Sequence, residues 1–274
     1  MTAIETTVSV PQVATDGVKL RLERVQKAYQ TPAGETLQIL TETTFEVRNR
    51  EIVTIVGPSG CGKSTLLNIL AALTEPSGGR MLIDGGEQRD RGRYFGYMFQ
   101  KDLLFPWRKI IDNVALGLEI QGTPREKARV LSADMLKRFG LNKFAAHYPS
   151  QLSGGMRQRV ALMRTLLCDR PILLLDEPFA ALDALTRSVM QEWLLQIWEQ
   201  DHRTILFITH DVEEAIILSD RVLVMSARPG RIKFEVAINL PRPRDHTLRT
   251  ASEFTELKRL VLDQIYEETL KSLE

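Results

Sequence analysis

The chain has 274 residues, of which 43% are hydrophobic and 26% charged, the balance of a folded globular protein rather than a disordered one. Its 36 lysines and arginines nearly cancel its 35 acidic residues, and a net charge of +1 argues against a dedicated nucleic-acid binder. Short apolar runs, the two cysteines Cys61 and Cys168, and a start without a secretory pattern predict a cytosolic protein without membrane spans or disulfides.

From residue 18 to residue 240, strand-like and helix-like patterns alternate. Residues 1–17 are polar and without period, which predicts a flexible tail. The alternation of Val18, Leu20 and Leu22 predicts a first, half-buried strand in an N-terminal antiparallel β region. Short apolar runs predict further strands at Thr43–Val47, Ile52–Val56, Tyr94–Phe99, Ile172–Leu175, Thr204–Ile208 and Arg221–Met225. With helical patterns between them, including Lys63–Leu73 and Leu185–Trp198, they predict an α/β fold with a mostly parallel sheet.

Residues 101–168 interrupt this alternation, because they contain several helical patterns and no clear strand. At residues 123–126, the sequence TPRE predicts a helix start with Thr123 as the N-cap, Pro124 in first position and Glu126 completing a capping box. We therefore predict a helical subdomain inserted between two parts of the α/β core.

The chain after Leu240 forms a separate unit in the sequence. Pro241-Arg242-Pro243 marks a break, and apolar residues then recur at helical spacing at Phe254, Leu257, Val261 and Ile265. This predicts a C-terminal helical extension over residues 241–274, which either docks on the core or binds a partner.

Residues 57–65, GPSGCGKST, match the phosphate-loop pattern G-x-x-x-x-G-K-[ST] in every fixed position. Glycines let the backbone wrap so closely that its N–H groups point at phosphate oxygens, and the following helix adds the positive end of its dipole. Lys63 would reach the β- and γ-phosphates, and the Ser64 hydroxyl would bind Mg²⁺. The predicted nucleotide-binding residues are Gly57, Pro58, Ser59, Gly60, Cys61, Gly62, Lys63, Ser64 and Thr65.

Cys61 lies inside this loop and allows two interpretations. The loop N–H groups and the charge of Lys63 would favour its thiolate and make it reactive. Alternatively, Cys61 is a small, inert residue packed beneath the loop.

Two further strand ends carry polar residues that suit the same site. Asp176 and Glu177 end the strand that begins at Ile172, and His210 follows the strand at 204–209. Parallel sheets place ligands at the carboxyl ends of their strands, so these side chains should face the phosphate loop. Asp176 would hold Mg²⁺, Glu177 would polarise the attacking water, and His210 would donate a hydrogen bond to the γ-phosphate.

The segment Leu152-Ser153-Gly154-Gly155-Met156 precedes a helical pattern at 157–167. A serine N-cap with two glycines exposes N–H groups at a helix start and predicts a second anion site. By itself the signal is weak, since Ser-Gly-Gly is commonly a simple turn.

Taken in order, GPSGCGKS, Gln100, LSGGM, ILLLDEP, ALD and His210 resemble the nucleotide-binding subunits of ATP-binding cassette (ABC) transporters over about residues 18–230. The LSGGM segment is the discriminating element, with Met156 where many cassettes have Gln. The resemblance implies that Tyr29 stacks on adenine and that Gln100 contacts Mg²⁺ and senses the γ-phosphate. It also implies that Glu177 is the catalytic base and His210 the γ-phosphate switch.

The resemblance further implies a dimer of cassettes that sandwiches two ATP molecules. Asp183 would link the two halves of the dimer. Ser153, Gly154 and Gly155 would then serve the nucleotide held by the phosphate loop of the second subunit.

Four further segments, LFPWR at 104–108, NVALG at 113–117, YPSQLSGGM at 148–156 and SARPGR at 226–231, resemble the nitrate/sulfonate/taurine group of importers. This resemblance implies an ATP- and Mg²⁺-dependent ATPase, most simply a homodimer, that powers a separate membrane permease. A substrate-binding protein would be an indirect partner, nucleic acid would not bind, and the subunit would lie at the cytoplasmic face of the inner membrane. The chain ends near residue 274, and we expect no regulatory barrel of the kind found on sugar-importing cassettes.

Two other functions remain open at this stage, a cassette ATPase of DNA maintenance and one of iron–sulfur assembly. The segment after Gln100 discriminates between them and a transporter. Leu103, Leu104, Phe105 and Trp107 would suit contact with a permease helix. The alternative is that these apolar residues only pack the helical subdomain.

Overall fold

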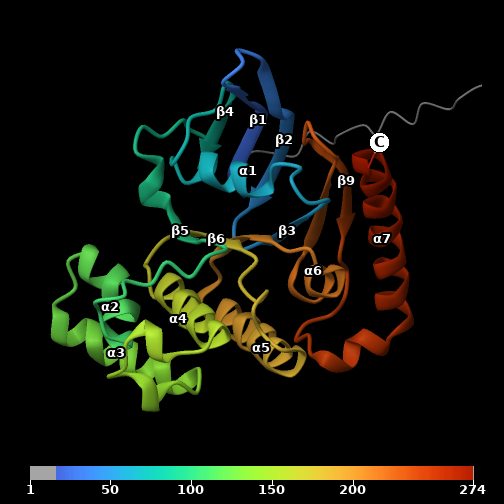
Figure 1. The fold of residues 1–274 in the computed structure, drawn as a ribbon. Helices are drawn as coiled ribbons and strands as arrows, with labels where there is room; N and C mark the ends of the chain where they lie inside the picture. The colour runs from blue at the N-terminus through green and yellow to red at the C-terminus, as the bar shows by residue number, and fades with distance from the viewer. Residues whose placement is uncertain (1–16, 274) are drawn as a thin grey trace, which may run out of the picture.

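The computed structural model describes residues 17–273, and a six-stranded sheet forms its centre (Figure 1). The tail predicted for residues 1–17 lies outside the described residues except for Gly17. The strand order is β5 (Phe95–Met98), β6 (Ile172–Asp176), β7 (Thr204–Ile208), β3 (Ile52–Val56), β8 (Arg221–Met225) and β9 (Ile232–Ala237). Neighbouring strands run parallel from β5 to β8, and only β9 pairs antiparallel, with β8.

The N-terminal part of the chain forms a second, three-stranded antiparallel sheet, in which β1 (Val18–Gln30) lies between β2 (Thr36–Arg48) and β4 (Gly78–Ile83). The predicted α/β class with an N-terminal antiparallel region is therefore confirmed. The sequence patterns marked only parts of β1 and β2 and missed β4 and β9. In β4 and in β9, apolar side chains that are at least half-buried occupy only half of the positions. Neither strand therefore forms a long apolar run.

The central strands are buried on both faces, which explains why their sequences do not alternate. In β3, Ile52 and Val56 join one hydrophobic core, and Val53 and Ile55 join the other. Helix α1 (Lys63–Leu70) packs between the two sheets (Figure 1). On the opposite face lie α4 (Gly154–Leu166), α5 (Ala184–Asp201) and α6 (Val212–Leu218).

Between β5 and β6 the chain is helical, with α2 (Ile110–Ile120) and α3 (Arg125–Arg138) preceding α4. The predicted capping box is wrong. Pro124 is the N-cap of α3, its carbonyl accepts from Ala128 N–H at 2.9 Å, and no side chain caps the helix. Thr123 instead ends the preceding helix, because its N–H donates to Leu118 O at 2.9 Å through a turn at Gly122, which has φ 88°.

The C-terminal helix α7 (Ser252–Leu273) docks on the core along β9 and α6 (Figure 1). Phe254 and Val261 are fully buried, and Leu257 and Ile265 pack against the same core. The docked alternative is therefore confirmed. No helix within residues 17–273 has the length and hydropathy to span a bilayer.

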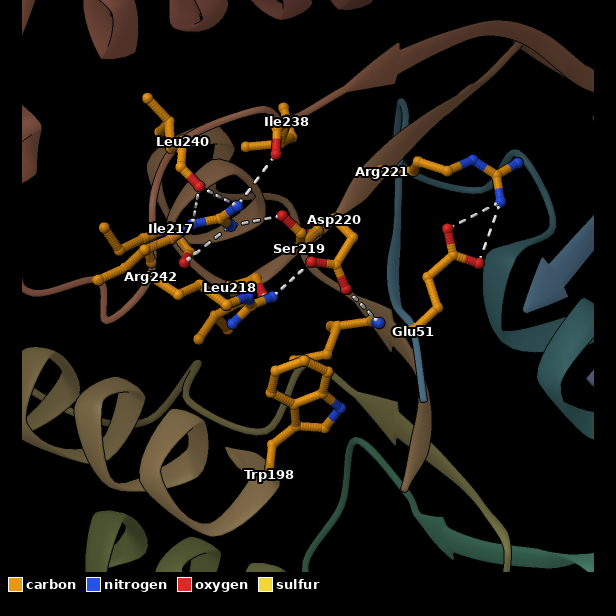
Figure 2. Close-up of polar contacts among 12 residues, drawn as sticks. Glu51, Trp198, Ile217, Leu218, Ser219, Asp220, Arg221, Ile238, Leu240 and Arg242 are labelled. Carbon is orange, nitrogen blue, oxygen red and sulfur yellow. Dashed lines mark hydrogen bonds and ion pairs between the residues drawn. The ribbon is translucent and has the colours of Figure 1, made fainter. Parts of the chain in front are cut away.

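Arg242 and Arg244 fix the segment that leads to α7, and Figure 2 labels Arg242 together with Ile238 and Leu240, whose backbone oxygens accept from Arg244. Arg242 donates to Asp220 Oδ1 at 2.7 Å, and its guanidinium lies 4.2 Å from the centre of the Trp198 ring. Arg244 is buried and donates to backbone oxygens that include Ile238 O and Leu240 O, both at 3.0 Å. Burial lowers the pKa of Arg244 to about 10, so the side chain stays charged at neutral pH.

Candidate nucleotide-binding site

The phosphate loop runs from the end of β3 to the first turn of α1 and is packed from below. A Cβ on Gly57 would lie 2.9 Å from Met225 O, and one on Gly62 would lie 2.7 Å from a methyl group of Leu40. Gly62 also has φ 107°, which favours glycine. The motif glycines are therefore needed both for backbone conformation and for close approach.

Lys63 is 9% exposed and folds over the loop. Its ammonium donates to Gly57 O at 2.8 Å and Pro58 O at 2.9 Å. These neutral carbonyls hold the side chain in place without cancelling its charge, so the charge remains available to an anion in the loop.

A cavity of about 360 Å³ opens beside the loop. Its lining brings together predicted residues from distant parts of the chain: Tyr29, Ser59, Gly60, Gly62, Lys63, Ser64, Thr65, Gln100 and Glu177. The ring of Tyr29 is 44% exposed at the rim, where a planar base can stack on it. Ile39 and Arg228 also line the cavity and were not predicted.

Cys61 is only 1% exposed and lies beneath the loop. Burial raises the pKa of its thiol, although the Lys63 ammonium at 3.8 Å from Sγ acts in the opposite direction. The predicted activated thiolate is therefore wrong, and the packed alternative holds.

Asp176 ends β6 next to the phosphate loop, with its side chain 3% exposed. Burial and the neighbouring Glu177 raise its pKa, and a hydrogen bond from the Ser64 hydroxyl opposes them. The raised pKa means that burial disfavours the ionised carboxylate, and a bound cation would stabilise it. Asp176, Ser64 and Gln100 offer carboxylate, hydroxyl and amide oxygens, the hard ligands that Mg²⁺ takes together with phosphate oxygens.

Glu177, which follows β6, contacts side chains that follow the ends of two neighbouring strands, β5 and β7. Its carboxylate accepts from Gln100 Nε2 at 3.3 Å, after β5, and Oε2 lies 3.2 Å from His210 Nδ1, after β7. Its backbone has φ 48° and is held by a hydrogen bond from its N–H to Ile208 O at 2.9 Å. The three residues predicted from separate motifs thus form one cluster, in which Gln100 and Glu177 line the cavity and His210 lies outside its lining, in contact with Glu177.

Gln158 on α4 supports this cluster and was missed by the sequence analysis. Its side chain is buried, donates to Glu177 O at 2.8 Å and accepts from Ala181 N–H at 2.7 Å. The signal was available, because Gln158 shares a helical face with the buried Ala161 and Leu162. A polar residue on an apolar face points to a buried hydrogen-bond partner.

The LSGGM segment lies outside the cavity. Ser153 is the N-cap of α4 and accepts from Met156 N–H at 3.3 Å, and Ser153 and Gly154 are exposed. Asp183 is the exposed N-cap of α5, and hydrogen bonds from Thr186 lower the pKa of its carboxyl. Within one chain, the structure does not bring Ser153, Gly154, Gly155 or Asp183 to the phosphate loop.

The chain resembles known proteins across this site. Residues 40–180 match the family model described as ABC transporter. An uncharacterized ABC transporter ATP-binding protein of Methanocaldococcus jannaschii is 47% identical over 93% of this chain and 94% of its own length. The taurine import ATP-binding protein TauB of Rhizobium johnstonii is 41% identical over 87% of this chain and 93% of its own.

A solved structure shows a similar fold. It is the dimeric, post-hydrolysis state of the ATP-binding cassette MJ0796 bound to ADP and Pi. That cassette is 32% identical, with a TM-score of 0.73 over 81% of this chain and 100% of its own.

Proposed function

This chain belongs to the ABC transporter family, and we propose that it is the ATP-hydrolysing subunit that powers a membrane permease importing nitrate, a sulfonate such as taurine, or a related small solute. The observation that carries the proposal is the convergence of Gln100, Glu177 and His210 beside the phosphate loop. Iron–sulfur assembly and DNA maintenance are not favoured, because TauB, which is 41% identical to this chain, is named an import ATP-binding protein.

ATP would bind with its triphosphate in the phosphate loop and its adenine on Tyr29. The loop N–H groups, the start of α1 and the Lys63 ammonium supply positive potential along the phosphates. Ser64, Asp176 and Gln100 would hold Mg²⁺, which neutralises charge on the phosphates when bound.

Glu177 would accept a hydrogen bond from the attacking water and hold it in line with the γ-phosphorus. Gln100 and His210 both contact Oε2 of Glu177, so they fix the direction in which the carboxylate points. The side chain of His210 is 66% exposed, so it can turn from Glu177 to a γ-phosphate oxygen. Positioning of this kind is most of what phosphoryl transfer requires of a protein.

The active form would be a homodimer. Ser153, Gly154 and Asp183 are exposed at two helix starts, where a second subunit could reach them. In that arrangement the LSGGM segment of one subunit completes the nucleotide site of the other. The dimeric state of the similar cassette supports this model.

The segment at residues 103–107, here called the coupling loop, would contact the permease at the cytoplasmic face of the inner membrane. Leu104 is buried, but Leu103 and Trp107 are 50% and 72% exposed, and Phe105 stacks on Trp107 at 5.1 Å. The packing alternative therefore describes Leu104 and not the other three. Exposed, mutually stacked apolar rings favour a protein contact.

The coupling loop is tied to α4, the helix that begins at the LSGGM segment. Arg157 Nε donates to Asp102 Oδ2 at 2.9 Å, and Arg164 donates to Asp102 O at 2.8 Å and Leu103 O at 2.9 Å. Movement of a bound permease helix would therefore be passed to α4 and, through Gln158, to Glu177.

Substitution Glu177→Gln tests the proposed function. The amide keeps the shape of the side chain but not the carboxylate that orients water, so we expect hydrolysis to slow about 100-fold or more. Because ATP then persists, ATP with Mg²⁺ should convert the variant to a dimer in size-exclusion chromatography. A variant that binds ATP but stays monomeric, even with its permease present, would contradict the sandwich model.

Substitution Trp107→Ala tests the coupling loop. We expect solute uptake to be lost while the isolated subunit keeps its basal ATPase rate and its Tm, because the ring is largely exposed. Tyr266→Ala, which removes an aromatic ring from α7 at a residue that is 66% exposed, is the matched control and should leave uptake unchanged. A large fall in Tm would instead indicate a buried ring, whose deletion typically costs about 3–5 kcal/mol.

A further inference from the structure

The turn between β8 and β9, residues 226–231, rests directly on the phosphate loop. Nε and Nη2 of Arg228 donate to Gly60 O at 3.2 and 3.0 Å. A Cβ on Gly230 would lie 2.0 Å from Cys61 O, so only glycine allows this approach. The turn is therefore one wall of the loop, although the two are 168 residues apart in the sequence at Arg228 and Gly60.

Arg228 brings a positive charge to the nucleotide cavity. It is exposed and lines the cavity together with Tyr29, Lys63 and Glu177. Its acceptor in the loop is a neutral carbonyl, and no ion pair joins it to a carboxylate within residues 17–273. A guanidinium has five N–H donors, and the bonds to Gly60 use only part of them. Arg228 can therefore hold the loop and still offer charge and donors to a phosphate.

The other side of the same turn is held by the C-terminal helix. Oε2 of Glu268, on α7, accepts from Ala227 N–H at 2.9 Å, and Oε1 accepts from Lys233 and Lys271, both at 2.8 Å. The residue is only 2% exposed. Burial by itself would raise the pKa of Glu268, but these hydrogen bonds lower it to about 2. The carboxylate is thus ionised at neutral pH and fixes the residue that precedes Arg228.

We propose that Arg228 is a nucleotide-binding residue, a second cation beside Lys63 at the phosphates of a nucleoside di- or triphosphate, and that Glu268 is its positioning residue. The inference rests on the proposed ATPase function. It makes α7 a functional part of the nucleotide site, because the contact from Glu268 to Ala227 sets where the guanidinium of Arg228 lies.

Calorimetric titration of the full chain with ADP and Mg²⁺ tests Arg228 without relying on catalysis. We expect Arg228→Gln to weaken ADP binding about tenfold, the usual scale for loss of a charged hydrogen bond, and Arg228→Lys to weaken it less. Arg231→Gln is the matched control, since Arg231 is an exposed arginine of the same turn that does not line the cavity. Equal affinities for Arg228→Gln and Arg231→Gln would overturn the assignment.

Lys63→Ala, titrated in parallel, separates this inference from the proposed function. If Lys63→Ala binds ADP as tightly as the wild type, the nucleotide site itself is wrongly placed. If Lys63→Ala loses binding while Arg228→Gln keeps it, only the role of Arg228 fails.

A double-mutant cycle tests Glu268. We expect Glu268→Gln to weaken ADP binding about three- to tenfold, and the double variant with Arg228→Gln to bind no more weakly than Arg228→Gln alone. Additive losses would show that Glu268 does not act through Arg228. Should Glu268→Gln unfold at the working temperature, Glu268→Asp keeps the charge but withdraws the carboxylate from Ala227, and the same cycle applies.

Discussion

The phosphate loop and the LSGGM segment have the same local chemistry, but the first is enclosed by protein and the second faces solvent. The phosphate loop opens α1 with glycines and Ser64, and the LSGGM segment opens α4 with Ser153 and two glycines. Each leaves backbone N–H groups at a helix start, which is an anion-binding arrangement.

Their packing separates them. The phosphate loop is enclosed by Leu40, Met225 and Gly230, and the side chain of Lys63 is folded over it. Ser153 and Gly154 face solvent. The first loop is therefore preorganised by its own chain, and the second gains a ligand only when another molecule is brought to it. Local sequence sets the chemistry of a loop, and distant packing decides whether the loop is complete.

The largest effect should come from breaking the enclosed loop. Lys63→Ala removes the charge that faces the phosphates, and we expect ATP hydrolysis to fall at least about 100-fold and nucleotide binding to weaken. Steady-state phosphate release measures the rate, and Lys143→Ala, at an exposed lysine of the helical region, is the control. Hydrolysis within tenfold of the wild type would exclude this assignment of the phosphate loop.

The exposed loop should fail in a different way, through the partner's site. In a mixed dimer, Lys63→Ala and Ser153→Arg placed on one chain spoil different sites, so both sites fail. Placed on opposite chains, they spoil the same site and leave one complete, and we expect about half of the wild-type rate if the sites act independently. Differently tagged subunits purified in tandem allow the comparison. Equal residual rates for the two arrangements would contradict sharing across the dimer.

The sequence predicted those parts of the site that local patterns carry. The phosphate loop has its own motif, and Asp176, Glu177 and His210 follow from the rule that parallel strands place ligands at their carboxyl ends. Gln158 and Arg228 have no such motif, because their partners are distant in the chain and only the fold brings them together. The roles of the predicted residues remain predictions.

Contacts that the local sequence does not reveal also explain the errors in the predicted fold. Thr123 has the sequence of an N-cap, but its N–H is taken by the end of α2. Strands β4 and β9 are as long as the central strands, but each is half exposed and so lacks a continuous apolar run, and each is held by the strand that it pairs with. A competing local turn decides the structure at Thr123, and strand pairing decides it at β4 and β9.

A smaller effect should follow from removing the buried contact that joins α4, the helix after the exposed loop, to the segment after β6. Gln158→Leu leaves Ala181 N–H without its buried partner, which typically costs about 1–3 kcal/mol. Glu177 O loses its shorter hydrogen bond and keeps the one from Ala180 N–H at 3.3 Å. We expect the rate constant for hydrolysis to fall about tenfold while KM for ATP changes little, because Gln158 does not line the cavity.

Gln200→Leu, at an exposed position of α5, is the matched control for this change. A thermal melt determines how much folded protein contributes to the rate. If Gln158→Leu lowers Tm but leaves the rate per folded molecule unchanged, Gln158 stabilises the fold and does not position Glu177.

The smallest effect concerns the rate at which a reagent labels the Cys61 thiol, and its measurement does not involve ATPase activity. Cys61 lies in the enclosed loop, 1% exposed, and burial raises the pKa of its thiol above the ordinary 9.0. A maleimide should therefore label Cys61 slowly in the folded protein, with or without ADP, and readily in denaturant, because reaction requires both exposure and the thiolate.

Ser153→Cys places a thiol at the equivalent start of α4, where it is exposed and the helix dipole favours its thiolate. Peptide mass spectrometry over a time course should show the thiol at 153 labelled at least about tenfold faster than Cys61. Fast labelling of Cys61 that ADP suppresses would mean that the phosphate loop opens to solvent when empty, and the contrast between an enclosed and an exposed loop would then hold only for the nucleotide-bound protein.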